Sequence, residues 1–200
     1  GHDLALFPGG KGANQAVACA KAGGAETCFI GAMGDDAFAQ TLHAALQDSG
    51  VMDHSIECPS TPTGAAFICV SDTGENAITL APGANHRLTP DVASTALRPL
   101  LATGRCRYLL LQAEIPMATN VAVAQLAREA RIQVVFNAAP ASHLPPALLE
   151  CLDVLIVNTL ELEAIAPQIA AELKAQRTVQ TPADNLTDRE RMLVQRFGNN

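Results

Sequence analysis

The stretch RYLLLQAEIPMATNVAVAQLAREARIQVVFN, residues 107–137, decides the fold class of this chain. It begins and ends with apolar runs, RYLLLQ (107–112) and IQVVFN (132–137), that are typical of buried parallel strands. Residues 117–130 between them are expected to form a helix. The same alternation continues in a helix expected at 91–102, for which Thr89-Pro90-Asp91 has the chemistry of a helix N-terminus. Further helices are expected at 146–151 and 159–175, with a strand at DVLIVN, 153–158. We therefore predict a mostly parallel, doubly wound α/β sheet.

The N-terminal part repeats this alternation and then departs from it. A helix over 12–22 ends at Gly23-Gly24, and Asp35-Asp36 begins a second helix that runs to Asp48. Strands are expected at DLALF (3–7) and TCFIGAM (27–33). Residues 55–80 instead read as two strands around the turn at 71–74 with no helix between them. We predict that this hairpin leaves the parallel sheet as a small antiparallel appendage.

Polar residues follow the strands where the apolar runs end. Gln112, Glu114, Asn137 and Asn158 all lie at such carboxyl ends. Ligands of doubly wound sheets bind outside the carboxyl ends of the strands, so these side chains are site candidates.

Composition excludes several classes of partner. The 200 residues carry a net charge of −7, which argues against nucleic acid and anionic membrane surfaces, since both attract clustered lysine and arginine. No apolar run is long enough to span a membrane. Six cysteines are scattered without metal-ligand spacing, and we expect Cys19, Cys28, Cys69 and Cys106 to be buried as small hydrophobic residues. Unpaired thiols favour a cytoplasmic location.

The sequence PGGKGANQA, residues 8–16, has the residue types of a phosphate loop in the wrong order. The G-x-x-x-x-G-K-[ST] pattern fails because Gly12 follows Lys11, and G-x-G-x-x-G fails because Gln15 replaces the third glycine. Three glycines let a ligand approach the backbone, while Asn14 and Lys11 supply hydrogen-bonding groups suited to sugar hydroxyls. The stretch therefore favours a polyhydroxylated ligand over a phosphate.

The chain resembles the ribokinase family of carbohydrate kinases over roughly residues 3–165. The resemblance rests on an ordered set of motifs, of which the first is closest to the ribokinase branch of the family. They are PGGKGANQAVACAKAGG (8–24), FIGAMGDDAF (29–38), TPTGAAFICVSDTGENAITLAPGAN (61–85), LLLQAEIP (109–116), VVFNAAPA (134–141) and VNTLELEA (157–164).

The resemblance implies roles for individual residues. Gly9, Gly10, Lys11 and Asn14 match the sugar-binding turn of the family, and Glu114 matches a carboxylate that contacts the sugar. Asn158 and Glu161 match a motif that places the phosphates and Mg²⁺. Residues 57–81 match a β lid that closes over the sugar and pairs with the lid of a second subunit. ATP, Mg²⁺ and a monovalent cation (K⁺) are the cofactors that the resemblance implies, and a homodimer is the assembly.

The departures from the family pattern are also informative. The first strand of the family, with an aspartate that grips the sugar, is expected upstream of Gly1. The Gly-Ala-Gly-Asp turn, with the catalytic base and the anion hole, and the cation site are expected beyond the C-terminus. We therefore assign no catalytic residue and expect this chain to be inactive alone, as part of a longer enzyme. The expected parts are an α/β core (13–54 and 86–175), a lid with the sugar turn (1–12 and 55–85) and a tail (176–200).

The reaction that the resemblance implies is ATP-dependent phosphorylation of ribose to ribose 5-phosphate. A kinase of another sugar or of a nucleoside, or a non-catalytic fragment, are the alternatives. Some candidates also have purely structural interpretations. Glu114 has the position of a cap for the helix that follows Pro116, and Asn158 and Glu161 have positions that cap the helix after residue 158.

Overall fold

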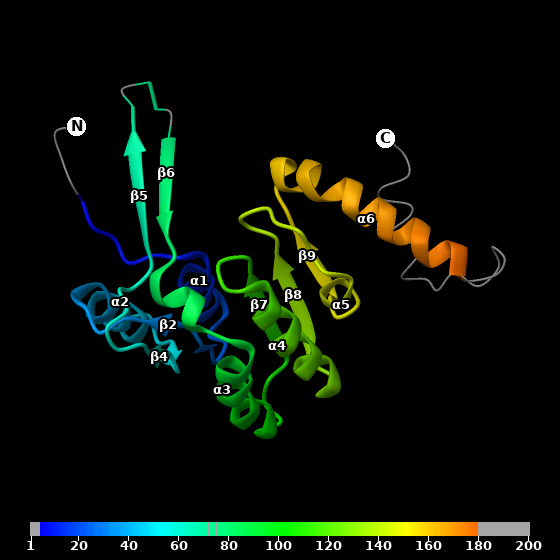
Figure 1. The fold of residues 1–200 in the computed structure, drawn as a ribbon. Coiled ribbons are helices and arrows are strands. Elements are labelled where there is room, and N and C mark those ends of the chain that lie inside the picture. Colours follow the sequence, from blue (N-terminus) through cyan, green and yellow to red (C-terminus); the bar gives the residue numbers. More distant parts are fainter. Residues whose placement is uncertain (1–4, 72, 75, 180–200) are drawn as a thin grey trace. The chain divides into compact units, whose positions relative to one another are not determined.

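Parallel strand pairs, a three-stranded parallel sheet and one antiparallel hairpin make up the sheets of the computed structural model, which describes residues 5–71, 73–74 and 76–179 (Figure 1). The chain separates into two compact units, Gly1–Ile165 and Ala166–Asn200. Every element below belongs to the first unit except for the later part of the last helix. The α/β class with mostly parallel strands is confirmed.

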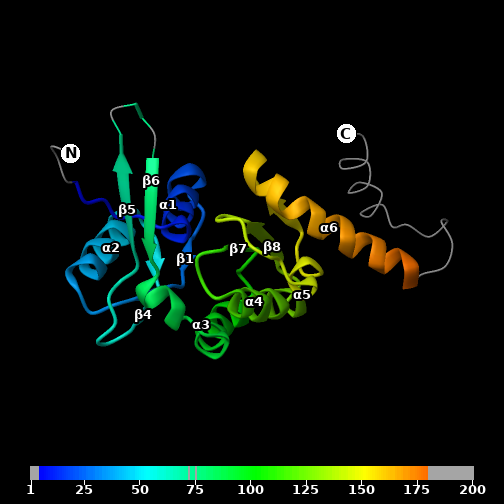
Figure 2. The ribbon, with the colours of Figure 1, turned by 45° about the horizontal axis from the view of Figure 1, so that its top comes forward.

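The three-stranded sheet is formed by the region that the opening stretch predicts. Strands β7 (Tyr108–Gln112), β8 (Gln133–Asn137) and β9 (Val154–Ile156) pair in parallel in that order. The helices between and after them are α4 (Met117–Glu129), α5 (Pro146–Leu149) and α6 (Thr159–Val179). Helix α4 packs on β7 and β8 and also contacts α3 (Pro90–Ala102) and α5 (Figure 2). The register that pairs Gln112 with Asn137 brings two of the predicted strand ends side by side.

The N-terminal elements form a second parallel ladder. Helix α1 (Lys11–Gly23) precedes β1 (Cys28–Phe29) and β2 (Ala32–Met33), and α2 (Ala37–Asp48) precedes β3 (Met52–Asp53) and β4 (Ile56–Glu57). β1 pairs with β3 and β2 pairs with β4 in one common register. The single strand expected at 27–33 is therefore interrupted, at the place where the Phe29 ring lies over Gly31.

The core of this part is built from small and aliphatic side chains on α1, α2 and the ladder. Alanines on α1 allow the helices to pack closely, in keeping with the low aromatic content of the chain. Its buried members are Ala13, Ala16, Met33, Ala39, Leu46 and Val51. Helix α1 contacts both β1 and β7, so one helix serves both groups of parallel strands.

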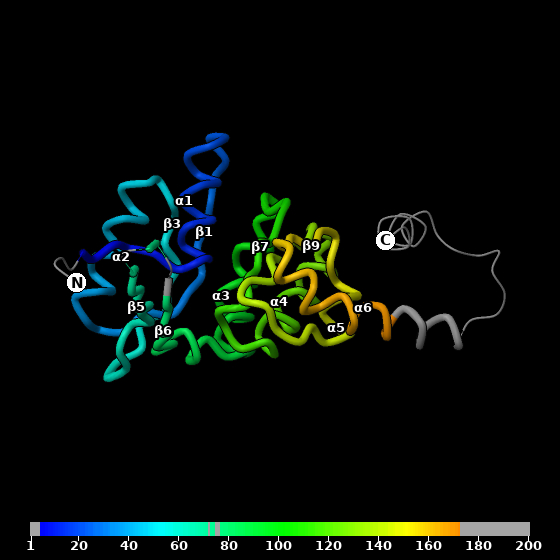
Figure 3. The backbone as a smooth tube through the Cα atoms, turned by 90° about the horizontal axis from the view of Figure 1, so that it is seen from above, coloured from blue at the N-terminus to red at the C-terminus, as the bar shows by residue number. Residues whose placement is uncertain are grey.

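The predicted hairpin is present as an antiparallel pair outside the parallel strands. β5 (Ala65–Val70) and β6 (Asn76–Ala81) pair along their whole length. The chain then passes through the short 3₁₀ helix η1 (Gly83–Arg87) into α3, a path that Figure 3 follows from β6 onward. Thr89 caps α3 as its sequence predicts.

The base of the hairpin is held between two glycines. A Cβ at Gly34 would lie 2.2 Å from the Thr61 carbonyl oxygen, and one at Gly83 would lie 2.3 Å from that of Pro62. Thr63 donates from its backbone N–H and its hydroxyl to Asp36, at 2.8 and 2.7 Å, and its hydroxyl accepts from the Gly34 N–H. Asp36 also caps α2 through the Ala39 N–H, as predicted. The N-cap of α2 therefore fixes the hairpin as well.

Two expectations from the sequence are wrong. Residues 5–7 of the expected strand DLALF have no regular structure, and residues 3–4 lie outside the described part of the chain. Cys28 and Cys69 are exposed and Cys19 and Cys106 are half-buried, whereas Cys151 is buried. Apolar neighbours in sequence did not imply burial because, within the described part of the chain, no second layer covers the hairpin that carries Cys69. In the described residues, no helix is long and apolar enough to cross a membrane. The proposed part boundaries, including the tail (176–200), remain a prediction.

We predict that the Asp36 contact makes stability depend on pH. Hydrogen bonds from the Thr63 hydroxyl, and then from the N–H groups of Thr63 and Ala39, hold the pKa of Asp36 below its usual value. This contribution is complete above the unfolded carboxyl pKa and is lost as pH falls through the lower folded pKa. Asp36→Asn should lower the free energy of unfolding by about 1–2 kcal/mol at pH 7, with the difference from wild type shrinking in acid.

Urea unfolding between pH 7 and pH 3 measures this difference. Asp48→Asn, at an exposed carboxylate on the last residue of α2, is the matched control. A constant gap between wild type and Asp36→Asn across this pH range would contradict the prediction.

Candidate functional site

The glycine-rich turn at 8–14 leads directly into α1. Gly10 has φ +93°, a backbone conformation that side chains of L-residues rarely adopt, and it occupies the N-cap position. Glycine has no side chain with which to cap the helix. The free N–H groups of the first turn of α1 therefore need acceptors from elsewhere.

Glu114 supplies that acceptor from the end of β7. Its Oε2 accepts from the Lys11 backbone N–H at 2.7 Å, although the two residues are 103 positions apart. Glu114 therefore caps α1 and does not cap α4, whose start at Pro116 has no side-chain cap. The structure thus brings Gly10, Lys11 and Glu114 together, and the carboxylate keeps acceptor sites beyond the one that this hydrogen bond uses.

Each of the three glycines of the turn is explained by a different feature of the structure. Gly10 has a positive φ, and a Cβ at Gly12 would lie 3.0 Å from Oε1 of Gln112 and 3.4 Å from the Phe29 ring. Space beside Gly9 is open except for the Phe7 carbonyl oxygen at 4.0 Å. Close approach of a ligand, the reason expected from the sequence, therefore suits Gly9, whereas Gly12 accommodates a side chain of the same protein.

Asn14 lies in the first turn of α1, where its N–H donates to the Gly10 carbonyl oxygen at 2.9 Å and its side chain is exposed. The turn thus presents the Asn14 amide and the half-buried Lys11 on the helix end that Glu114 caps. Gly9, Gly10, Lys11, Asn14 and Glu114 remain the proposed sugar-binding set.

Sequence reasoning missed a contact between side-chain amides beside this turn. Gln112 Nε2 donates to Gln15 Oε1 at 2.7 Å, and Gln15 Nε2 donates to Asn137 Oδ1 at 3.3 Å. Asn137 Nδ2 in turn donates to the Ile156 carbonyl oxygen at 3.1 Å. Gln112 and Asn137 were visible as strand ends, and Gln15 follows Lys11 by one helical turn, but only the fold joins the three.

Asn158 and Glu161 cap the start of α6 reciprocally. Asn158 Oδ1 accepts from the Glu161 N–H at 2.8 Å, and Glu161 Oε2 accepts from the Asn158 N–H at 2.8 Å. The structural interpretation of this pair is thus realised, and its geometry leaves the second carboxylate oxygen for other partners. Across residues 5–179, apart from the two undescribed positions, no group of three or more His, Cys, Asp and Glu side chains could hold a metal ion.

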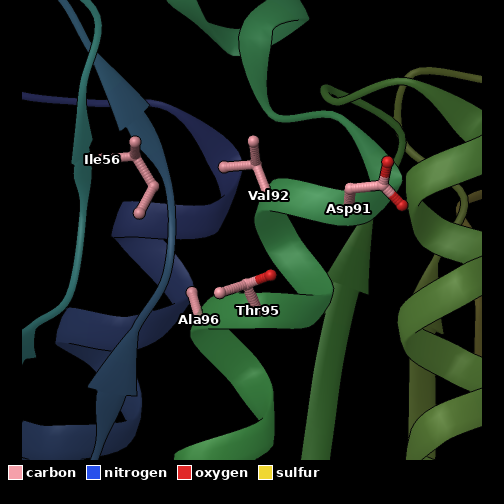
Figure 4. Close-up of a pocket in the computed structure, with 5 residues that line it drawn as sticks. All are labelled: Ile56, Asp91, Val92, Thr95 and Ala96. Carbon is pink, nitrogen blue, oxygen red and sulfur yellow. The ribbon is translucent and has the colours of Figure 1, made fainter.

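A hollow of about 340 Å³ lies away from these residues, between β4 and α3 (Figure 4). The hollow is lined by Ile56, Asp91, Val92, Thr95 and Ala96. Asp91 is in the first turn of α3, where a carboxylate is favourable for the helix dipole without any ligand. None of the predicted site residues lines this hollow.

Comparison with known proteins matches residues 1–184 to the model of the pfkB family carbohydrate kinases. The chain belongs to the pfkB family of carbohydrate kinases. It is 37% identical over 166 residues to a ribokinase of Haemophilus influenzae and 34% identical over 172 residues to one of Lactococcus lactis. These alignments cover 82% and 86% of this chain and 53% and 56% of the relatives. The resemblance that the motifs predicted is therefore confirmed.

Solved structures give the same family. A ribokinase of Arabidopsis thaliana, solved in complex with ribose and ATP, superposes with a TM-score of 0.70 at 31% identity. The match covers 83% of this chain and 57% of that one. This pfkB chain thus spans about half the length of the relatives it matches.

The Glu114 cap yields a test that needs no ligand. Glu114→Leu should lower the free energy of unfolding by about 1 kcal/mol, the usual effect of losing a helix cap, and should speed hydrogen exchange at the Lys11 amide. Glu114→Gln keeps an acceptor oxygen and should retain most of both. Glu129→Leu, at an exposed position on α4, is the control. Denaturant unfolding and amide exchange measure the effects, and unchanged exchange at Lys11 in Glu114→Leu would refute the cap.

Proposed function

We propose that this chain is the sugar-binding part of an ATP-dependent kinase that phosphorylates the 5-hydroxyl of ribose. The observation that carries the proposal is the Glu114 carboxylate held against the glycine-rich turn, in a chain of the pfkB family. The curated relatives named ribokinase and the solved relative that holds ribose and ATP support ribose as the substrate.

The chemistry of the turn suits a sugar. Each hydroxyl of a sugar both donates and accepts, and Asn14 offers both functions while Lys11 only donates and Glu114 only accepts. The open space beside Gly9 admits a ligand to the backbone. On this proposal the turn and Glu114 orient the sugar, and orientation supplies much of the rate enhancement in phosphoryl transfer.

Asn158 and Glu161 are proposed to serve the phosphate side of the reaction. Mg²⁺ usually binds through one or two carboxylates together with waters and phosphate oxygens, so the second carboxylate oxygen of Glu161 fits as part of such a site. When bound, the ion neutralises phosphate charge. Asn158 at the start of α6 is proposed to help place the phosphates. K⁺ is proposed from the family alone, and a cytoplasmic location is proposed from the unpaired thiols.

The β5–β6 hairpin is proposed to act as a lid and to pair with the hairpin of a second copy. Residues that alternate along its strands share one face, which is apolar and more than half exposed. They are Ile68 (58%), Val70 (66%), Ile78 (58%) and Leu80 (55%). An isolated two-stranded hairpin is marginal in water, so burial of this face would stabilise it.

The alternatives are phosphorylation of another sugar or a nucleoside, and a chain that binds sugar without turnover. The sequence contains no Gly-Ala-Gly-Asp turn, and loss of a general base alone costs about 10²–10⁴-fold in rate. We therefore propose that these 200 residues turn over very slowly by themselves.

Binding and turnover are measured separately to test this function. Calorimetric titration should show ribose bound more tightly than fructose or adenosine, and Asn14→Ala should weaken ribose binding about 10-fold, equal to about 1.4 kcal/mol. ATP-dependent phosphorylation should stay below about 1 s⁻¹. Gln40→Ala, at an exposed position on α2, is the control. Tighter binding of fructose or adenosine would contradict ribose as the substrate. Failure to bind any of the three ligands would refute the proposed function, and turnover faster than about 1 s⁻¹ would refute the predicted inactivity.

The lid pairing is tested by mass in solution. Light scattering of the chain at increasing concentration should approach the dimer mass, and Ile68→Lys should keep it monomeric because a charge cannot be buried in the paired face. Thr73→Lys, in the turn between the strands, should still dimerise. A monomer at all concentrations in the wild type would contradict the pairing.

A further inference from the structure

We propose that the amides of Gln112, Gln15 and Asn137 form a positioning chain of fixed polarity that holds the sugar-binding turn against the strand ends. The inference rests on the proposed function for the meaning of the turn. It gives a positioning role to three residues that are not in the proposed sugar-binding set.

The polarity of the chain is set at one end by the backbone. The Ile156 carbonyl oxygen can only accept, so Asn137 must present its NH₂ group there, at 3.1 Å. Asn137 then has only its oxygen left for Gln15, which must present its own NH₂ group, at 3.3 Å. Gln15 consequently offers its oxygen to the NH₂ group of Gln112, at 2.7 Å. Each amide orientation follows from the one before it.

The chain ends at the turn. Oε1 of Gln112, the remaining oxygen, lies 3.0 Å from where a Cβ at Gly12 would stand. The Gln112 amide thus occupies the space that glycine leaves beside the first turn of α1. Its backbone is fixed too, because the fully buried Asn120 donates from Nδ2 to the Gln112 carbonyl oxygen at 2.9 Å. Glu114, which caps α1, follows two residues later.

These contacts join four elements near the turn. Gln15 extends from α1, Gln112 ends β7, Asn137 ends β8 and the Ile156 carbonyl ends β9. A shift of α1 along its axis would break the Gln15 contacts together with the Glu114 cap. The neutral amides therefore set where the turn stands, and Gln15 is the central positioning residue because it has partners on both sides.

Gln15→Glu tests the polarity at nearly constant volume. An ionised carboxyl accepts from Gln112 but cannot donate to Asn137, whereas a protonated carboxyl can do both. Carboxyl groups of glutamate protonate near pH 4.3. Gln15→Leu fills similar space and restores nothing in acid. Gln125→Glu, at an exposed position on α4, is the charge control. Lys11, one helical turn before Gln15, and Glu114, two residues after Gln112, carry charges near the amides in sequence, and both are present in every variant.

The readouts are the midpoint of thermal unfolding, hydrogen exchange at the Lys11 amide and the Kd for ribose, each at pH 7.5 and pH 4.5 and each relative to wild type. At pH 7.5 both Gln15 variants should unfold roughly 4 °C lower, exchange Lys11 faster and bind ribose about 10-fold more weakly. At pH 4.5, where roughly 40% of ordinary glutamate carboxyl groups are protonated, Gln15→Glu should recover part of each loss and Gln15→Leu none. Gln125→Glu should match the wild type throughout.

The outcomes separate this inference from the proposed function. Equal behaviour of Gln15→Glu and Gln15→Leu at both pH values would overturn the polarity. A lowered unfolding midpoint with unchanged Lys11 exchange would overturn the positioning role. A wild type that binds no ribose would refute the proposed function, and recovery of the midpoint and of Lys11 exchange in acid would still support the amide chain.

Discussion

The Glu114 carboxylate on the Lys11 N–H is the interaction on which the site depends. Helix α1 begins at a glycine that cannot cap it, so its first turn needs an acceptor from another part of the chain. The acceptor lies just after β7, which pairs with β8, at the point where the chain turns towards α4. The glycine-rich turn is a local feature of the sequence, but its position is fixed by a contact with a sheet whose strands come about a hundred residues later in the chain. A carboxylate is the suitable cap because the helix N-terminus favours negative charge.

A second constraint acts at the base of the hairpin, where backbone and not side chains fills the space. The segment that enters β5 passes so close to Gly34 and Gly83 that any side chain there would collide with a carbonyl oxygen. Asp36 meanwhile binds Thr63 and caps α2 with the same carboxylate. The close contacts are concentrated at the base, whereas the strands beyond it expose both of their faces. Such an arrangement directs the hairpin without burying it.

The sequence predicted those features that depend on neighbours along the chain. Strand and helix order, the Thr89 and Asp36 caps and the hairpin all follow from local patterns, and the structure has them. Features that depend on distant partners were missed or misjudged. The alternative structural interpretation of Glu114 placed its cap on the wrong helix, and Gln15 was not selected. Cys69 was expected to be buried, although no layer of the described residues covers β5. Apolarity predicts burial only where the topology supplies a second surface.

The choice of groups at the strand ends follows from electrostatics. Charged side chains in the same half-buried positions would need opposite charges beside them or would cost several kcal/mol in lost hydration. Amides avoid this cost, and each can both donate and accept, so a row of them transmits one orientation from the Ile156 carbonyl to Gln112. Glu114 is then the carboxylate that adjoins the turn, and its charge is offset by the helix N-terminus that it caps. A ligand that enters beside Gly9 would therefore meet a carboxylate acceptor and the donors of Lys11 and Asn14, next to a row of oriented neutral amides. Such a mixture of acceptor and donors suits the recognition of hydroxyl groups better than that of phosphate.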